Sequence, residues 1–310
     1  MTTTETPTDP HLSPLTAPQV DRLVALALAT CRKLGFDLEY DAGALIPAAV
    51  LDALDPEAPG PILGLTNLAR AIAQEDPDDW PQFVDTHFTE LLRRLDEGAP
   101  DPPDDPAREL IQRLVPRTSL PPHWVADRPD VIPGLLSVPA TLHDTTVTMY
   151  LDPTDLGLTW SAAEALGLAN LRRRTDHLEL LEEDGVQLAR LTGDSFTASR
   201  ALVLDTVLRE TLQLPDLPSA VLAAVPARDL LLIHVIQDLK VLPALGLLLH
   251  LTARAHSQAP GPLSPEVHLV TFTTSGHPTW HPATTSTSPT ALALSTQLTT
   301  LITCLPSEIR

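Results

Sequence analysis

The sequence predicts an α+β fold in two lobes, with a mixed or antiparallel sheet packed against helices. Strand patterns and helix patterns follow one another without strict β-α-β alternation. A hairpin is indicated where Leu178–Leu181 and Val186–Leu191 flank an Asp-Gly turn at 184–185. A run rich in Pro and Asp at 99–106 then reads as a linker that separates a small N-terminal lobe from a larger C-terminal one.

The N-terminal lobe is predicted over 16–98, after a polar, Pro-rich stretch at 1–15 that we expect to be disordered. Thr16 and Gln19 have the spacing of a capping box and begin a helix that ends near Gly35. Strands are expected at 36–41, 44–54 and 62–65. Two further helices begin at the caps Thr66 and Asp79, and the second of them ends at Gly98.

The C-terminal lobe is predicted over 107–273. It opens with a short helix and a strand that leads to Arg117, followed by an irregular Pro-rich stretch at 120–133. Further strands, some with the unbroken apolar runs of buried strands, are expected at 135–138, 145–151, 178–181, 186–191, 220–225, 230–236 and 267–273. Helices are expected at 161–172, after Thr197, and at 239–255, which is nearly all apolar and therefore central.

The last part of the chain is predicted to be a flexible linker at 274–290, rich in Thr, Ser, Pro and His, and a tail at 291–310. Leucines in the tail recur at spacings of three and four, which indicates a short amphipathic helix. Such a helix either folds back onto the body of the protein or docks on a partner, and we expect it to fold back.

The composition narrows the class of protein. A formal net charge of −20 repels nucleic acid and disfavours anionic membrane surfaces. Arg172, Arg173 and Arg174 are the only tight basic cluster, and their place predicts the C-terminal turn of a helix. Cys31 and Cys304 lie in apolar helical patterns, which predicts two buried thiols in a reducing cytoplasm. With no signal-peptide pattern at the start, we expect a soluble cytoplasmic protein with neither nucleic acid nor membrane as partner.

Sequence motifs for common chemistries are absent: there is no phosphate-binding glycine loop, no G-x-S-x-G and no H-E-x-x-H, so no cofactor is expected. His277 and His281 have a metal-ligand spacing, but the prolines after each make a helix there unfavourable. Asp152 and Asp155 could hold a divalent cation, although an Asp-Pro β-turn explains both. His234, in an apolar strand, is expected to be a hydrogen-bonded core or edge histidine.

Two segments place charge at the edge of apolar runs. Asp194 and Arg200 flank a predicted helix start, and Arg228 and Asp229 precede a predicted buried strand. If the two starts are neighbours in space, the four side chains form either a structural ion-pair cluster or a site for an anion or a peptide carboxylate. We favour the structural cluster. Arg117 joins them as a candidate for the anion-binding alternative.

Taken in order, these segments resemble the YtpQ-like family, bacterial cytoplasmic proteins of unknown function. The resemblance covers about residues 17–273, and it is carried by 64–68, 114–119, the strand at 145–152, Trp160, the helix ending at 169–171, 194–200 and 225–233. It implies a cytoplasmic α+β protein and supplies no catalytic residue and no cofactor. The Pro-rich insert at 120–133 and the tail after 274 depart from the family.

The sequence therefore favours a non-catalytic binding or regulatory module that acts on a protein partner, because no nucleophile, base and orienting group can be assembled from it. One alternative is a hydrolase or metal-dependent enzyme that uses Asp152, Asp155, Asp194 and Asp229. Another is an anion-binding sensor that uses Arg117, Arg200 and Arg228. The oligomeric state is left open by the sequence.

Overall fold

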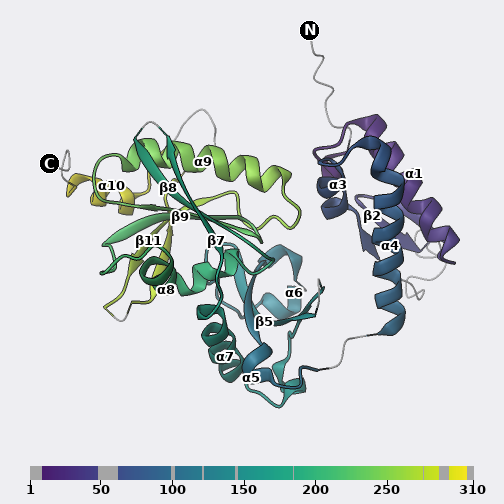
Figure 1. Cartoon of the computed structure of the whole chain (residues 1–310), viewed down its shortest axis with the longest axis horizontal. Helices are drawn as coiled ribbons and strands as arrows, with labels where there is room; N and C mark the ends of the chain where they lie inside the picture. The colour runs from purple at the N-terminus through teal and green to yellow at the C-terminus, as the bar shows by residue number, and fades with distance from the viewer. Residues whose placement is uncertain are drawn as a thin grey trace, which may run out of the picture. The chain divides into compact units, whose positions relative to one another are not determined.

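The chain has an α+β fold with antiparallel sheets, seen in a computed structural model (Figure 1). The structure describes residues 9–47, 62–98, 102–120, 122–143, 146–183, 185–274, 276–285 and 293–305. The chain divides into two units: residues 1–101 with 257–261, and residues 102–256 with 262–310. The division after residue 101 falls inside the stretch 99–106 that the sequence marks as a linker. None of the described helices combines the length and the hydropathy needed to cross a bilayer.

The first unit packs helices against a small antiparallel sheet in the order β1-β2-β3. Its elements are the 3₁₀ helices η1 (Pro10–Leu12) and η2 (Pro77–Asp79), the helices α1 (Ala17–Lys33), α3 (Thr66–Ile72) and α4 (Trp80–Glu97), and the strands β1 (Leu38–Asp41), β2 (Ala44–Pro47) and β3 (Leu63–Gly64). The predicted capping box forms, since the Thr16 backbone nitrogen donates to Gln19 Oε1 at 2.9 Å. Leu23 and Phe88 place the facing sides of α1 and α4 in one core.

The N-terminal segment corrects one prediction. Residues 1–15 were expected to be disordered, yet residues 9–15 contain η1, and the side chains of Leu12 and Leu15 are fully buried in the core of the first unit. Two leucines in a polar stretch thus suffice to attach the segment, because their burial removes apolar surface from water. Residues 1–8, and the part of the predicted 44–54 strand after Pro47, lie outside the described residues.

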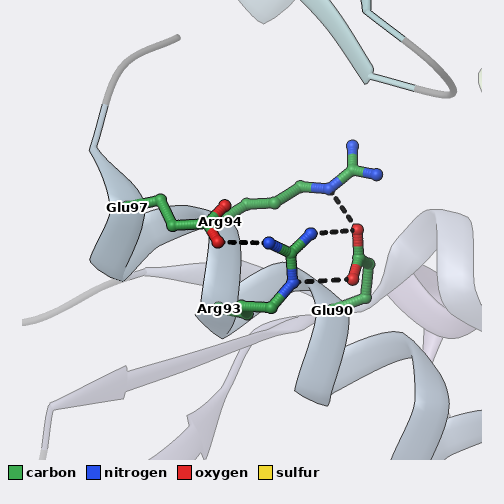
Figure 2. Close-up of polar contacts among 4 residues, drawn as sticks. All are labelled: Glu90, Arg93, Arg94 and Glu97. Atoms are coloured by element: carbon green, nitrogen blue, oxygen red, sulfur yellow. Dashed lines mark hydrogen bonds and ion pairs between the residues drawn. The ribbon is translucent and has the colours of Figure 1, made fainter.

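The outer face of α4 carries a network of ion pairs (Figure 2). Glu90 accepts from Arg93 Nη2 at 2.9 Å and from Arg94 Nε at 2.5 Å, and Arg93 also pairs with Glu97. These are neighbours one helical turn apart on a solvated face, where solvent screens ion pairs and each contributes little to stability. The network therefore lies on the solvent-exposed face of α4, and we assign it no function.

The second unit is built on a six-stranded antiparallel sheet in the order β12-β11-β9-β10-β8-β7. Its strands are β7 (His177–Glu183), β8 (Val186–Thr192), β9 (Ala220–Ala227), β10 (Leu230–Val235), β11 (Val267–Phe272) and β12 (Pro278–Pro282). A three-stranded sheet, in the order β4-β5-β6, contains β4 (Ile111–Pro116), β5 (Leu135–His143) and β6 (Thr146–Met149). Every residue of β9 is buried, as its unbroken apolar run predicts for a central strand.

Helices cover both faces of the large sheet. One face packs on α9 (Val241–Gln258) and α10 (Thr296–Thr303), and the other packs on the segment 198–211, which joins η5 (Ala198–Val203), α8 (Leu204–Thr206) and the π-helical turn η6 (Val207–Thr211). The remaining elements are α5 (Pro106–Glu109), η3 (Arg117–Ser119), α6 (Pro122–Val125), η4 (Pro153–Leu156) and α7 (Trp160–Arg172). Figure 1 shows α9 running along the sheet and α10 near the C-terminus.

Two predictions about the end of the chain have different outcomes. The tail does form a helix, α10, and it folds back, with Leu298 fully buried against the core that α9 helps to build. The stretch 274–290 was predicted to be a flexible linker, and this is wrong for 278–282, which form β12 and pair with β11. Prolines at both ends of β12 are tolerated because an edge strand needs its N–H groups on one side only.

Candidate functional site

Arg200, one of the predicted site residues, has a structural role. Its side chain is only 2% exposed, and its Nη1 donates to the carbonyls of Leu171 at 2.6 Å, Arg172 at 3.3 Å and Arg174. These carbonyls end α7, where backbone acceptors have no partner in the helix and a cation is favoured by the helix dipole. Arg200 Nε also lies 3.2 Å from the buried Asp176 Oδ2. Arg200 therefore caps the C-terminal end of α7 through Nη1, while its Nε faces Asp176.

Arg117 has a similar structural role in a different place. Its Nε donates to Asp130 Oδ1 at 2.7 Å, its Nη1 to the Val125 carbonyl at 2.7 Å, and its Nη2 to the Arg128 carbonyl. The Pro-rich insert, predicted to be irregular, is thus ordered around one guanidinium. Arg128 in turn lies over both Trp124 and Trp160, with Cζ at 4.0 and 3.8 Å from the ring centroids.

The two segments are neighbours in space, as the prediction required, but no described ion pair links Asp194, Arg228 or Asp229 to Arg117 or Arg200. Asp194 pairs with Arg174, and its Oδ1 accepts from the Phe196 backbone nitrogen at 2.8 Å. Arg228 and Asp229 form the turn between β9 and β10, where the Arg228 carbonyl accepts from the Ala198 nitrogen at 3.0 Å. Within the described ranges neither Arg228 nor Asp229 has an ion-pair partner.

The weak metal candidates have ordinary structural roles. Asp152 Oδ1 accepts from the backbone nitrogen of Thr154 at 3.0 Å and from its hydroxyl at 2.6 Å, which is the turn that the Asp-Pro sequence favours. Asp155 follows in η4, and His277 and His281 lie on the β11–β12 hairpin. Among the described residues, no three or more His, Cys, Asp or Glu side chains are placed to hold a metal ion.

A cluster of charges that the sequence indicated only in part surrounds Phe196. The guanidinium groups of Arg113 and Arg174 lie 5.7 and 5.4 Å from the centroid of this fully buried ring. The pKa of Arg113 is lowered to about 10, mainly by burial and then by the charge of Arg228, whereas the charge of Asp194 opposes the shift. We call Arg113, Arg174, Asp194 and Arg228 the Phe196 cluster. Its sequence signal is Arg113, a lone charge inside the apolar strand β4.

The second unit also has a cleft of about 480 Å³ where β7, β8 and β10 meet the loop after β10. Apolar side chains lie beside polar ones, and its main lining residues are Leu180, Glu182, Gln187, Leu212, Leu214, Ile233, His234, Asp238 and Lys240. Apolar clefts with a few convergent polar groups are the usual form of a binding site. Of the residues that line this cleft, only His234 is a candidate from the sequence.

His234 is held firmly in this wall. Its Nδ1 lies 2.8 Å from the Gln187 carbonyl, and because a carbonyl can only accept, Nδ1 must carry the proton. Burial lowers the pKa of His234, although the Gln187 hydrogen bond and the charge of Asp238 oppose the shift. The predicted hydrogen-bonded core histidine is confirmed.

The strand beside the cleft, β7, is the last strand of the large sheet. It pairs with β8 on one side, and within the described residues its other side has no strand partner. None of its residues is buried, and the side chain of Leu180 is 67% exposed. Glu179 pairs with Arg190 at 3.2 Å, whereas no cation in the described part of the chain pairs with Glu182 or Glu183.

No family model, curated protein or solved structure matches this chain. Its function must therefore be inferred from the residues of the cleft, the strand edge and the Phe196 cluster.

Proposed function

We propose that this chain is a non-catalytic binding protein whose second unit binds an extended, basic segment of a partner protein along the free edge of β7. The observation that carries the proposal is this edge: an exposed strand that ends a six-stranded sheet and lies beside a cleft. An extended peptide can add to such an edge, since the unpaired N–H and C=O groups of the strand supply hydrogen bonds in register. The resemblance to the YtpQ-like family adds a cytoplasmic location to the proposal.

The other edge of the sheet suits an added strand less well. The outer strand there, β12, begins and ends with proline, and proline has no N–H to donate. The seven residues of β7 contain no proline. The contrast favours β7 as the place where a partner strand would pair.

The charges of β7 select the kind of partner. No cation in the described part of the chain pairs with Glu182 or Glu183. A second copy of β7 placed against the first would therefore set carboxylates near carboxylates, which is unfavourable. A strand with lysine or arginine at alternate positions would instead meet these carboxylates with opposite charge. The acidic strand thus disfavours self-association and favours a basic segment.

The cleft supplies a place for one long side chain of that segment. Asp238 and Lys240 both line the cleft, and Asp238 Oδ1 accepts from the Lys240 backbone nitrogen at 2.8 Å. Leu180, Leu212 and Leu214 offer apolar surface, and Glu182 offers a carboxylate. A lysine or arginine side chain fits both, because its aliphatic stem packs on apolar surface while its charged end stays with polar groups. Buried anchors of this type dominate the affinity of most interfaces.

The test uses the full chain and two fluorescent hexapeptides, one that alternates Lys with Val and one that alternates Glu with Val. We expect the Lys peptide to bind, as measured by fluorescence anisotropy, and to slow hydrogen exchange of the β7 amides, while the Glu peptide does not bind. Leu180→Glu and Glu182→Lys should each weaken binding by about tenfold or more, since each alters a central contact.

Two matched variants separate the strand edge from the overall negative charge. Glu164→Lys makes the same charge change on α7, and Leu242→Glu alters another exposed leucine on α9. Both should bind the Lys peptide as the unaltered chain does. Equal weakening by Glu164→Lys and Glu182→Lys, or binding without protection of β7, would show that the peptide follows net charge and that the proposal is wrong.

A further inference from the structure

Arg113 has a buried donor group without an acceptor. It lies in β4, and its Nη1 is shielded from solvent but has no hydrogen-bond partner among the described residues. Buried donors in folded proteins are nearly always satisfied, because an unmade hydrogen bond to a charged group is costly. An unsatisfied guanidinium nitrogen thus calls for a partner that comes from outside the described chain.

A second guanidinium without a carboxylate lies near the first. The backbone places both arginines beside residues 196–199: the Leu114 nitrogen donates to Ser199 Oγ at 2.9 Å, and the Ala198 nitrogen donates to the Arg228 carbonyl at 3.0 Å. The charge of Arg228 lowers the pKa of Arg113, as two neighbouring cations must do. Both side chains are partly exposed, while Nη1 of Arg113 itself is shielded from solvent.

The nearby carboxylate is already engaged. Asp194 accepts the Phe196 backbone N–H on Oδ1 and pairs with Arg174 through Oδ2. It offsets the charge of Arg174 first and that of Arg113 only in part, and among the described residues no ion pair neutralises Arg113 or Arg228. A water molecule would satisfy the Arg113 N–H but would not relieve the repulsion between the two cations.

We propose that Arg113 and Arg228 form an anion-binding site for a dianionic oxyanion, a phosphate group in particular. Two guanidinium forks match the geometry and the charge of a phosphate, which accepts paired hydrogen bonds from each. Against a net charge of −20, an anion binds only where cations gather locally. The anion-binding alternative from the sequence thus reappears on different residues: Arg113 takes the place of Arg117 and Arg200.

The experiment measures the melting temperature of the full chain against sodium phosphate, sodium acetate and sodium chloride at matched ionic strength. We expect phosphate to raise the melting temperature in a saturable way, acetate to act more weakly, and chloride to have no saturable effect. Arg228→Met and Arg113→Met should each weaken the apparent phosphate affinity by roughly tenfold or more. Arg113→Lys keeps the charge but loses the fork, so it should weaken binding too.

The control is Arg190→Met, which removes an exposed arginine of β8 that already pairs with Glu179. It should leave the phosphate response unchanged. Glu182→Lys at the β7 edge should also leave it unchanged, so the phosphate site and the proposed peptide site are tested independently. An equal response to chloride, or an equal loss in Arg190→Met, would overturn the proposal. If acetate raises the melting temperature as strongly as phosphate does, the site does not prefer a dianion, and that part of the proposal is wrong. If Arg113→Met does not fold, the phosphate response of Arg228→Met tests the proposal, because Arg228 lies in a turn where a substitution should leave the fold intact.

Discussion

At the scale of single residues, His268 is the titratable group whose burial most clearly lowers the stability of the fold. It lies in β11 with a fully buried side chain, and neither ring nitrogen has a hydrogen-bond partner among the residues that the structure describes. Its ring packs edge-on against Trp280, 5.8 Å away between centroids. Glu266 Oε2 is 3.6 Å from Nε2 and belongs to a half-exposed side chain, so it compensates little. Burial lowers the pKa of His268 to about 4.

This burial predicts a loss of stability in mild acid. The folded-state pKa of His268, about 4, lies below the value of about 6.5 in an unfolded chain, so protonation favours unfolding. The contribution is complete above about pH 6.5 and is lost as the pH falls toward 4. Between pH 7 and pH 5 the free energy of unfolding should fall by about 2 kcal/mol from this residue alone. Urea titrations of the second unit at both pH values measure it.

Removing the imidazole should remove that part of the pH dependence. His268→Phe keeps an aromatic ring against Trp280 but cannot be protonated, so its unfolding free energy should depend less steeply on pH. His250→Gln, a change at an exposed histidine of α9, should keep the original slope. A His268→Phe chain with the full slope would show that other groups cause the acid sensitivity.

Individual residues were predictable where one local pattern determines their role. His234 in an apolar strand had to find a hydrogen bond, and it does. Cys31 is buried as predicted, but Cys304 is exposed, because α10 ends there and presents only its leucine side to the core. Arg113 could not be predicted as a site residue, since Ser199 and Arg228 come from segments far along the chain.

At the scale of elements, α7 depends on a residue that comes after it in the chain. Arg200 donates to the last carbonyls of α7 and lies against the buried Asp176, whose pKa is raised by burial. Arg200→Met should cost about 3–5 kcal/mol of unfolding free energy, because it leaves a buried carboxyl without its cation. Asp176→Asn in the same chain should recover part of that loss. Arg209→Met, at an exposed arginine of η6, should cost little. Urea unfolding followed by circular dichroism distinguishes them, and equal costs for the two arginines would contradict the capping role.

Elements with strong local signals were predicted well. The β7–β8 hairpin forms with Leu181 opposite Leu188, and β9, α7 and α9 lie where their apolar patterns place them. The predictions were wrong for β12 and for residues 9–15. In both segments, prolines and polar residues outnumber the few apolar residues that make tertiary contacts. Composition favours disorder in both places, but pairing with β11 and burial of Leu12 and Leu15 come from tertiary contacts that composition does not contain.

At the scale of the whole molecule, the two units have separate cores. The first core is formed by residues 12–92 of the first unit, and the other clusters belong to residues 111–305 of the second. The sequence anticipated this in the Pro- and Asp-rich run at 99–106, where few apolar residues could join one core to the other. Units with their own cores can unfold independently.

Two substitutions, one in each core, test that independence. Phe88 in α4 is 1% exposed and Leu222 in β9 is 0% exposed. Truncating either to alanine removes buried surface and leaves a cavity, at a cost of roughly 2–5 kcal/mol. In scanning calorimetry of the full chain we expect two transitions, with Phe88→Ala lowering only one and Leu222→Ala only the other. If each substitution lowers both transitions equally, or if a single transition responds to both, the two cores unfold as one. In that case the stability gained on binding at the β7 edge or at the Phe196 cluster would extend to the first unit as well, because a ligand stabilises everything that unfolds together with its site.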